Sequence, residues 1–283
     1  MGALTNSRKE AALCDTLASL DSVVVAYSGG VDSAYLAVMA SRTLGDRALA
    51  VTADSGSYPE RHRRIAIEVA REFGLRHDVI HTGELERPDY RSNPENRCYF
   101  CKHELYTHLS AIATARGAVI VDGNNADDRS DYRPGRQAAR EFGVRSPLDE
   151  VDLAKAEIRE LSRLAGLQVW DEPASACLSS RIPYHSEVTG AKLQMIERAE
   201  QAIAAMGFRV CRVRHHRDDD RQRDVARVEI GRDEMAKAFE PASSEAIVRE
   251  LKAIGYADVT LDPRGYRMGS LNLLDGGVRL RVF

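Results

Sequence analysis

The stretch at residues 28–33, Ser-Gly-Gly-Val-Asp-Ser, has the residue types needed to bind a phosphate group. It follows an apolar run at residues 23–25 and precedes an apolar helical pattern, so the expected order is strand, tight turn, helix. Gly29 and Gly30 can adopt positive φ in such a turn, and without side chains they let backbone N–H groups close around an anion. The helix would aim its free N–H groups and positive dipole end at the same point. The hydroxyl donors at the two ends of the stretch are Ser28 and Ser33.

Two of the five cysteines, Cys98 and Cys101, form a C-x-x-C at the start of an expected helix. By itself this spacing fits a redox pair, half a zinc site or chance. A zinc site needs two further ligands, and the sequence has no second C-x-x-C to supply them. The residues alone therefore leave these alternatives open.

Cys177 lies among small residues, which leave its thiol approachable, and Arg181 follows four positions later. A nearby cation favours the reactive thiolate. A buried structural cysteine is the alternative for Cys177, and it is the prediction for Cys14 and Cys211, which fall in helical and strand patterns.

Two further polar tips follow expected strands. Asp54 and Ser55 end the second strand, and Gly123 lies in a glycine-containing tip at residues 122–128 after the fourth. The carboxyl ends of strands in an open α/β sheet face the ligand crevice, so both tips are expected near a nucleotide.

The elements that must position these residues alternate between strand and helix in the first half of the chain. This alternation predicts an α/β domain at residues 1–170 with a parallel sheet and right-handed crossovers. A Pro-, Ser- and Ala-rich seam at residues 170–189 precedes a small α+β domain, so the second domain is placed at residues 171–283. The expected helices are 5–20, 34–40, 59–73, 99–115, 136–142, 153–165, 191–206 and 243–254, and the expected strands are 23–25, 47–53, 76–81, 118–121, 208–215, 225–230 and 257–262.

Composition restricts the class of protein. The 283 residues are 43% hydrophobic and 29% charged with a net charge of −3, which is ordinary for a globular protein and does not indicate a polyanion partner. No apolar run reaches the roughly 20 residues that cross a bilayer, and the N-terminus shows no signal-peptide core. The expectation is a cytoplasmic protein with reduced thiols, no nucleic-acid partner and no membrane segment.

Taken together, the motifs resemble one family. The stretch at residues 28–33 is similar to the PP-loop of the ATP pyrophosphatases, which cut ATP between the α and β phosphates. The combined motifs, from about residue 5 to 275, resemble the LarE family of ATP-dependent sulfur transferases, which make the thiocarboxylates of the nickel-pincer nucleotide cofactor. The motifs that carry this resemblance are at residues 28–33, 96–102, 122–128, 131–135, 145–148, 173–183 and 213–216.

The resemblance implies that ATP-Mg adenylates a carboxylate of pyridinium-3,5-biscarboxylic acid mononucleotide, and that a sulfur nucleophile displaces AMP. In the single-cysteine type of this family the residue matching Cys177 gives up its own sulfur. In the three-cysteine type, the residues matching Cys98, Cys101 and Cys177 hold a 4Fe-4S cluster that delivers an extra sulfide. This sequence has all three cysteines, and three protein ligands leave one iron open. The cluster-dependent version is the prediction.

Other roles follow by position. Lys102, Arg133, Arg145 and Arg181 are candidate partners of phosphate or pyrophosphate, because arginine forks match phosphate geometry. Asp32 and Asp128 are candidate Mg²⁺ ligands. In the second domain, the expected ligands of the substrate phosphate are Arg212 and Arg214, and a candidate metal or substrate ligand is Glu229.

Arg212 and Arg214 are two residues apart on an expected strand, so their side chains share a face; a solvated strand face is the alternative. The resemblance also implies a homo-oligomer, with a trimer of dimers as the expected form. The family pattern departs at residues 218–223, a charged hairpin that we interpret as a solvated loop.

Three rival functions remain open on the sequence. A tRNA-thiolating PP-loop enzyme also adenylates, but it normally carries an RNA-binding appendage, which the electrically neutral second half does not indicate. An amide-forming synthetase would need an ammonia-producing segment before the loop. The non-enzymatic alternative is an ATP-binding sensor.

Overall fold

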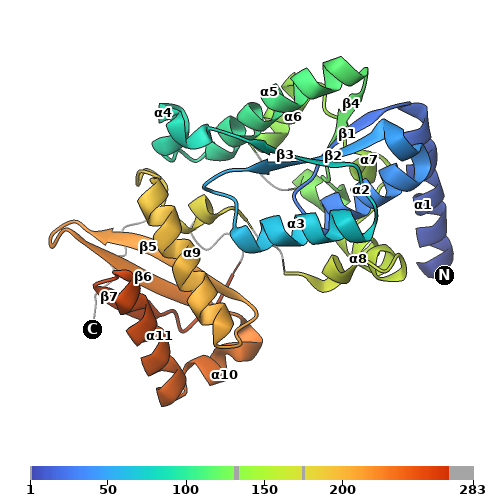
Figure 1. Ribbon diagram of the computed structural model, residues 1–283. Coiled ribbons are helices and arrows are strands. Elements are labelled where there is room, and N and C mark those ends of the chain that lie inside the picture. The colour runs from blue at the N-terminus through green and yellow to red at the C-terminus, as the bar shows by residue number, and fades with distance from the viewer. Residues whose placement is uncertain (1, 131–133, 174–175, 268–283) are drawn as a thin grey trace. The chain divides into compact units, whose positions relative to one another are not determined.

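The computed structural model describes residues 2–130, 134–173 and 176–267. The chain divides into two compact units (Figure 1): Met1–Tyr90 with Asn96–Ser175, and Arg91–Glu95 with Ala176–Phe283. The short segment Arg91–Glu95 belongs to the second unit because the buried side-chain amide of Asn93 donates to the carbonyl groups of Ile182, Pro183 and Ser186 at 3.3, 2.7 and 3.0 Å. The predicted boundary after residue 170 and the roles given to the two halves stay predictions.

Within the described residues, the first unit is built on a four-stranded parallel sheet in the order β3-β2-β1-β4. Its strands are β1 (Val23–Ala26), β2 (Ala48–Asp54), β3 (His77–His81) and β4 (Val119–Val121). Strands β1 and β2 pair from Val23↔Ala48 to Ala26↔Val51, so their carboxyl ends lie at one edge of the sheet. The α/β fold class and the parallel sheet expected from the sequence are confirmed.

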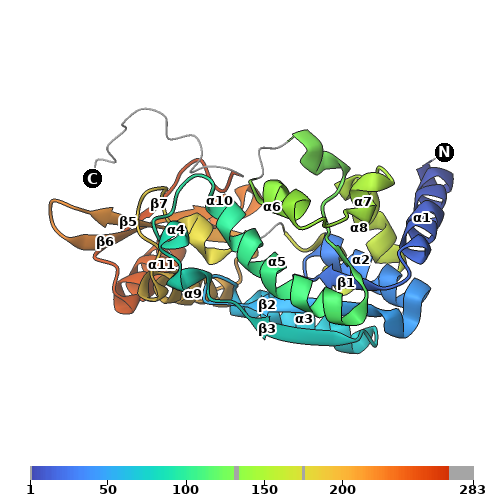
Figure 2. The same cartoon turned by 90° about the horizontal axis from the view of Figure 1, so that it is seen from above.

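Alternate residues of β1 face two different hydrophobic clusters. Val23 and Val25 pack into a core shared with α1, α2, α3 and α8, whereas Val24 and Ala26 pack into a second core shared with α5 and α6. Helices therefore cover both faces of the sheet (Figures 1 and 2). This arrangement explains why β1, β4 and most of β2 read as continuous apolar runs, because both of their faces are buried.

One helix of the first unit precedes the first strand, and the others lie between or after the strands. They are α1 (Gly2–Ser19), α2 (Val31–Leu44), α3 (Glu60–Glu72), α4 (Pro88–Arg91), α5 (Arg97–Arg116), α6 (Gly135–Glu141), α7 (Pro147–Glu150) and α8 (Lys155–Leu164), with 3-10 turns η1 (Gly45–Arg47), η2 (Glu84–Glu86), η3 (Ala126–Ser130) and η4 (Gln168–Asp171). Helix α4 reaches one residue into the segment that joins the second unit.

The second unit contains a three-stranded sheet in the order β5-β6-β7 within the described residues. Its elements are η5 (Leu178–Arg181), α9 (Gly190–Ala205), β5 (Cys211–Asp218), β6 (Arg223–Ile230), η6 (Arg232–Glu234), α10 (Met235–Ala238), α11 (Pro241–Ile254) and β7 (Asp258–Leu261). Strands β5 and β6 are antiparallel, and β7 is parallel to β6. One face of this sheet packs on α9 and α11 through Val213, Val228 and Leu251.

Most expected elements are present, with differences at their ends. Strand β5 begins at Cys211, three residues later than predicted, and it extends to Asp218, because the pairing with β6 continues to Asp218↔Arg223. In the charged hairpin at residues 218–223 only the first and last residues are paired, and residues 219–222 form an exposed turn, which agrees with the solvated loop expected from the sequence. Helix α5 begins at Arg97, which places Cys98 inside its first turn. The short helices α4, α7 and α10 were not predicted.

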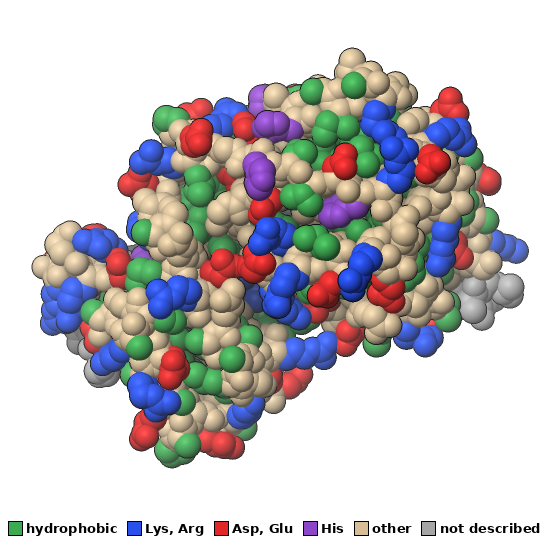
Figure 3. Space-filling view, in the orientation of Figure 1, with side chains coloured by type: hydrophobic (Ala, Val, Ile, Leu, Met, Phe, Trp, Pro, Cys, Tyr) green, Lys and Arg blue, Asp and Glu red, His purple; other side chains and the backbone are tan. Residues whose placement is uncertain are grey.

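The described surface mixes both signs of charge. On the face shown in Figure 3, lysine and arginine side chains are interspersed with aspartate and glutamate side chains. Across residues 2–130, 134–173 and 176–267, no helix combines the length and the apolar character needed to cross a membrane.

Candidate active site

The loop between β1 and α2 is shaped by one glycine with positive φ. Gly29 has φ +66°, and a Cβ placed on it would lie 2.9 Å from the Cβ of Ala66 in α3. Both the backbone conformation and the packing therefore require glycine at this position. Gly30 differs from the expectation: its φ of −71° and ψ of 156° are extended values that other residues can adopt. The turn needs one left-handed residue, and Gly29 supplies it.

Hydroxyl groups close this loop on itself. The Oγ of Ser33 accepts a hydrogen bond from the N–H of Ser28 at 3.2 Å, donates to the carbonyl of Gly30 at 3.0 Å and lies 3.1 Å from the Oγ of Ser28. From the neighbouring segment, the hydroxyl of Tyr58 donates to the carbonyl of Ser28 at 2.9 Å. The two serines hold the loop in its curved form at the start of α2, where an anion is favoured.

The polar tip after β4 packs against the same turn. A Cβ on Gly123 would lie 2.9 Å from the backbone nitrogen of Ser33, so glycine allows the two backbones to approach. At this tip the carboxylate of Asp122 accepts hydrogen bonds from Ser146 at 2.7 Å and from Tyr106 at 3.0 Å. The structure thus brings the loop and the second glycine-containing tip together, as their positions at strand ends predicted.

Asp32, in the first turn of α2, pairs with a lysine that lies outside the predicted motifs. Its Oδ2 accepts a hydrogen bond from the ammonium group of Lys155 at the start of α8. Its Oδ1 is buried and has no hydrogen-bond partner. Burial raises the pKa of Asp32, the charge of Lys155 opposes that rise, and the nearby charge of Asp128 adds to it.

These carboxylates fit a divalent cation. Asp32 offers one buried oxygen without a partner, and Asp128 is 7% exposed and close enough to repel Asp32 electrostatically. Carboxylate oxygens are preferred Mg²⁺ ligands, and a cation would relieve this repulsion. In the parts of the chain that the structure describes, no group of three His, Cys, Asp or Glu side chains forms a ready metal site.

The tip of β2 carries the predicted nucleotide ligands Asp54 and Ser55. The carboxylate of Asp54 lies 3.5 Å from the guanidinium of Arg63. The Oγ of Ser55 lies 3.1 Å from that of Ser57, whose own hydroxyl donates to the buried Glu84 at 2.7 Å. This tip is internally hydrogen-bonded, and the nucleotide-binding role of Asp54 and Ser55 stays a prediction.

Three predicted phosphate partners belong to the first unit. The ammonium group of Lys102 lies 5.5 Å from the ring centre of Tyr106, on the same helix. The guanidinium of Arg145 is held by Glu150, and its backbone extends the outer edge of β4. Arg133 lies outside the described residues. Their contacts to phosphate stay predictions.

Cys98 and Cys101 lie three residues apart in the first turns of α5, so they share one helix face. Cys98 is exposed and Cys101 is half-buried. Two thiols on one face at a helix N-terminus suit thiolate chemistry, because the positive end of the helix dipole stabilises negative charge. They fit two ligands of a cluster, and the third predicted ligand, Cys177, belongs to the second unit.

In the second unit, a buried arginine holds the backbone beside Cys177. Arg181 is 1% exposed, and its Nη1 donates to the carbonyl groups of Ala176 and Cys177 at 2.6 and 2.9 Å. Its Nε and Nη2 each donate to Glu200 of α9 at 2.9 Å. Burial by itself lowers the pKa of Arg181, but the charge of Glu200 reverses this effect and the pKa is raised overall.

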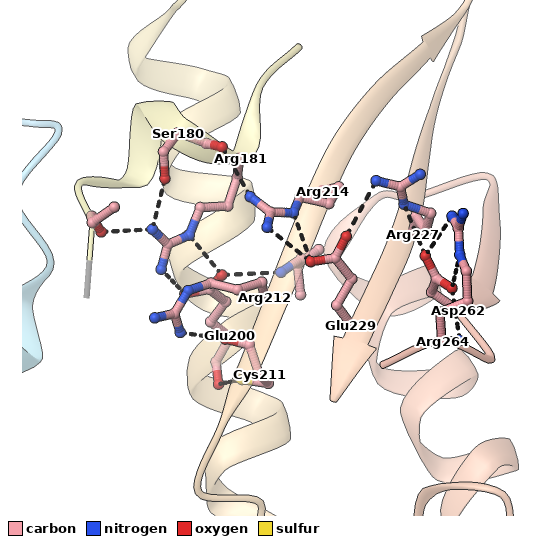
Figure 4. A network of polar contacts seen from close by, with 12 residues as sticks. Ser180, Arg181, Glu200, Cys211, Arg212, Arg214, Arg227, Glu229, Asp262 and Arg264 are labelled. Carbon is pink, nitrogen blue, oxygen red and sulfur yellow. Dashed lines mark hydrogen bonds and ion pairs between the residues drawn. The ribbon is translucent and has the colours of Figure 1, made fainter. Parts of the chain in front are cut away.

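The sheet face opposite α9 and α11 carries a buried network of arginines and carboxylates (Figure 4). Arg214 donates from Nε and Nη2 to one oxygen of Glu229, at 3.0 and 2.8 Å, and Arg227 donates to the other oxygen at 3.2 Å. Arg212 lies 5.0 Å from the ring centre of Tyr266. The predicted common face of Arg212 and Arg214 is confirmed by the register, which places them opposite Glu229 and Arg227.

Glu229 does not fit a metal ligand in this arrangement. Its side chain has no exposed surface, and both of its oxygens accept hydrogen bonds from arginines. A cation would have to displace at least one of them. Its predicted role as a ligand stays untested, and the contacts assign it a structural role between two arginines.

Sequence reasoning missed Lys155, Glu200 and Arg227. For Lys155 a signal exists: a lysine in the first turn of a helix opposes the helix dipole, so it indicates a compensating anion. Glu200 and Arg227 fall in ordinary helix and strand patterns, and no local signal marks them.

The sequence is similar to those of known nucleotide-using proteins. The NAD synthase family model matches residues 11–93. A protein of Methanopyrus kandleri, named as part of a glutamine-hydrolyzing GMP synthase, is 28% identical over 203 residues, covering 64% of this chain and 62% of that protein. An uncharacterized protein of Synechocystis sp. is 43% identical over 254 residues, covering 89% of this chain and 92% of its own length.

A strand, a Ser-Gly-Gly-x-Asp-Ser turn and a helix within a parallel sheet define this protein as a PP-loop enzyme of the ATP pyrophosphatase type. The pyridinium-3,5-bisthiocarboxylic acid mononucleotide synthase of Lactiplantibacillus plantarum is 33% identical over 270 residues, covering 95% of both chains. The chain therefore belongs to the LarE family of ATP-dependent sulfurtransferases, as its motifs predicted.

Proposed function

We propose that this enzyme adenylates the carboxylates of pyridinium-3,5-biscarboxylic acid mononucleotide with ATP and converts them to thiocarboxylates. The observation that carries the proposal is the relative named for the bisthiocarboxylic acid product, which matches along 95% of both chains. The curved loop closed by Ser28 and Ser33 supports it, because this loop presents a helix N-terminus to the phosphates.

The adenylation step joins the substrate to AMP. A substrate carboxylate oxygen attacks the α-phosphorus of ATP, the bond to the bridging oxygen of pyrophosphate breaks, and an acyl-AMP forms. Residues 28–33 bind and orient the phosphates, and Asp32 with Asp128 would hold Mg²⁺. When bound, Mg²⁺ would neutralise the negative charge that develops on the leaving pyrophosphate. Lys102, Arg133 and Arg145 are the proposed additional cations at this site.

The sulfur-transfer step needs a nucleophile that attacks the acyl carbon and expels AMP with the electrons of the carbon–oxygen bond. We propose that Cys98, Cys101 and Cys177 would hold a 4Fe-4S cluster. When bound, this cluster would carry the sulfide that is transferred to the substrate. The presence of all three cysteines supports this version. In the alternative, the Cys177 thiolate attacks the acyl carbon and expels AMP to form a thioester. Loss of the Cα proton then breaks the Cβ–S bond, which leaves the thiocarboxylate on the substrate and dehydroalanine at position 177.

The second unit is proposed to hold the substrate phosphate through Arg212 and Arg214. Burial of both side chains supports this role. Arg212 and Arg214 are 8% and 5% exposed, and burial, followed by the charge of Arg181, lowers the pKa of Arg212. Positive charge held in a buried place favours a bound anion such as a phosphate monoester.

Anaerobically purified protein, incubated with ATP, Mg²⁺ and the pyridinium substrate, tests the proposal. We expect pyrophosphate and AMP to be released, and mass spectrometry to detect exchange of oxygen for sulfur at the substrate carboxylates. Absence of pyrophosphate release would favour an ATP-binding sensor, and release with tRNA in place of the pyridinium nucleotide would favour a tRNA-thiolating enzyme.

Analysis of the same samples distinguishes the two sulfur sources. The cluster version predicts iron and sulfide in the purified protein and an unchanged mass of the peptide that contains Cys177. Loss of one sulfur from Cys177 after turnover would support the sacrificial alternative. The homo-oligomeric state and the cytoplasmic location stay predictions.

A further inference from the structure

Lys155 connects the start of α8 to the phosphate-binding loop. Its backbone N–H donates to Oδ2 of Asp127 at 2.8 Å, which anchors the residue at the helix N-terminus. Its ammonium group reaches Oδ2 of Asp32 in the first turn of α2. The side chain is 31% exposed, so solvent reaches it although its partner Asp32 is only 21% exposed.

This ion pair satisfies only half of the carboxylate. Oδ1 of Asp32 is buried without a hydrogen-bond partner, which is costly for a charged group. The charge of Asp128 also acts on Asp32 and raises its pKa, and the opposing effect of Arg159 is smaller. The guanidinium of Arg159 donates to the carbonyl groups of Trp170 and Glu172, so among the described residues Lys155 is the cation that contacts Asp32 directly. A site with these features is stabilised further by replacing the single charge of lysine with a divalent cation.

We propose that Lys155 is a displaceable counter-ion, which neutralises Asp32 while the nucleotide site is empty and moves to the leaving pyrophosphate when Mg²⁺ and ATP are bound. The inference rests on the proposed function, in which Asp32 holds Mg²⁺ and pyrophosphate leaves at this loop. It adds one residue, Lys155, to the groups that would stabilise the leaving group.

The chemistry of lysine suits this exchange. The ammonium group is a compact charge with three donors on a flexible stem. It can therefore change partners more easily than an arginine guanidinium, whose planar donors have to be realigned. The backbone bond to Asp127 holds the Cα in place, so only the side chain has to move. Asp32 is the second residue of α2, and the phosphate site at the start of that helix is within about one helical turn, roughly 5 Å, of the carboxylate.

The proposal predicts opposite effects on two ligands, which a purely structural role would not produce. Lys155→Met keeps the length of the stem and removes the charge. This variant has no cation that competes with Mg²⁺ for Asp32. In the absence of nucleotide it should therefore bind Mg²⁺ about tenfold more tightly than the wild type does. The same variant should bind Mg-pyrophosphate about tenfold more weakly, because it lacks the ammonium group.

Isothermal titration calorimetry measures both affinities on the full chain, with Lys9→Met as the matched control. Lys9 also pairs with α8, through Glu157 at 2.8 Å, but it does not contact Asp32. The control should leave both affinities unchanged. The inference would be overturned if Lys155→Met bound both Mg²⁺ and Mg-pyrophosphate more weakly, or if neither affinity changed.

A labelling experiment on the wild type does not depend on any variant folding. Reductive methylation followed by peptide mass spectrometry reports how accessible each lysine is. Mg²⁺ alone should raise the labelling of Lys155 relative to Lys9, and addition of pyrophosphate should lower it again. Labelling of Lys155 that responds to neither ligand would contradict the exchange.

These outcomes separate the inference from the proposed function. A wild type that releases no pyrophosphate from ATP and substrate would contradict the proposed function, while the Mg²⁺ measurement would still report whether Lys155 competes at Asp32. A wild type that releases pyrophosphate normally, combined with unchanged affinities in Lys155→Met, would contradict only the inference.

Discussion

Arg181 donates a hydrogen bond to the backbone carbonyl of Cys177 at 2.9 Å, and its other edge forms a fork with Glu200. The predicted sulfur-bearing residue is thus tied to helix α9 through one buried guanidinium. These contacts suit positioning of the Cys177 backbone. The predicted roles of Arg181, as a cation that favours the thiolate and as a phosphate partner, remain to be tested.

Arg181→Lys should separate the two half-reactions. Lysine keeps the charge but cannot bridge Glu200 and the carbonyl of Cys177 at once, so the loop loses its fixed position. We expect pyrophosphate release to persist and thiocarboxylate formation to fall by about tenfold or more, since misplacement of a reacting group is costly. The ratio of the two products measures this effect, with Arg198→Lys on the exposed face of α9 as the control. An equal fall in both products would argue against a positioning role.

Asp32→Ala should abolish pyrophosphate release. The change removes the proposed Mg²⁺ ligand and leaves Lys155 without its carboxylate partner. A pyrophosphate assay with ATP and substrate provides the measurement, and Asp15→Ala, at an exposed position of α1, is the control. Normal release by Asp32→Ala would show that Asp32 does not hold the metal.

Gly29→Ala and Gly45→Ala form a matched pair that tests the loop. Both glycines have positive φ, +66° and +57°, but only a Cβ on Gly29 would meet another atom within 4 Å. We expect Gly45→Ala to cost about 1 kcal/mol of the free energy of unfolding. Gly29→Ala should cost about 2–4 kcal/mol, because overpacking against Ala66 adds to the strain, and it should also weaken ATP binding. Urea unfolding and nucleotide titration measure these effects, and equal costs for the two variants would exclude a packing role for Gly29.

Cys98→Ser should prevent assembly of the proposed cluster. Serine cannot supply the thiolate, so protein reconstituted anaerobically with iron and sulfide should lack the iron–sulfur absorbance of the wild type. Cys14→Ser should retain it, because Cys14 is half-buried against the core of the first unit. Absorbance that survives in Cys98→Ser would contradict the three-ligand site.

His216 should make the protein sensitive to acid. Burial, followed by the charge of Arg227, lowers the pKa of His216 to about 4, against about 6.5 in the unfolded chain. The neutral form is therefore favoured on folding, so its contribution to stability is complete above pH 6.5 and is lost as the pH falls towards 4.

His216→Gln should reduce the loss of stability between pH 7 and pH 5 by about 2 kcal/mol. Urea denaturation at a series of pH values measures the difference, and His108→Gln, at an exposed position of α5, is the control. A pH profile that is unchanged in His216→Gln would show that the side chain is not held neutral by burial.

Local patterns determined the elements, and long-range contacts determined the partners of their side chains. Helix α3 was predicted within one residue at each end, because Pro59 precedes it and Gly74 with φ +62° follows it. Strand β5 was misplaced by three residues at both ends, because its limits depend on pairing with β6 and not on its own apolar pattern. The segment Arg91–Glu95 joined the second unit through Asn93, whose partners are about ninety residues away in the chain.

The amino-acid sequence alone determined that this protein has a PP-loop turn at residues 28–33, a parallel sheet to present it, and three cysteines in the pattern of a sulfurtransferase family. These features are encoded locally, in glycine positions, apolar runs and short motifs. Only the tertiary structure decided that Asp32 meets Lys155, that Glu229 is shared by Arg214 and Arg227, and that Arg181 holds the Cys177 backbone. A side chain's charge partner depends on which distant segments the hydrophobic cores bring together, and no local pattern records that choice.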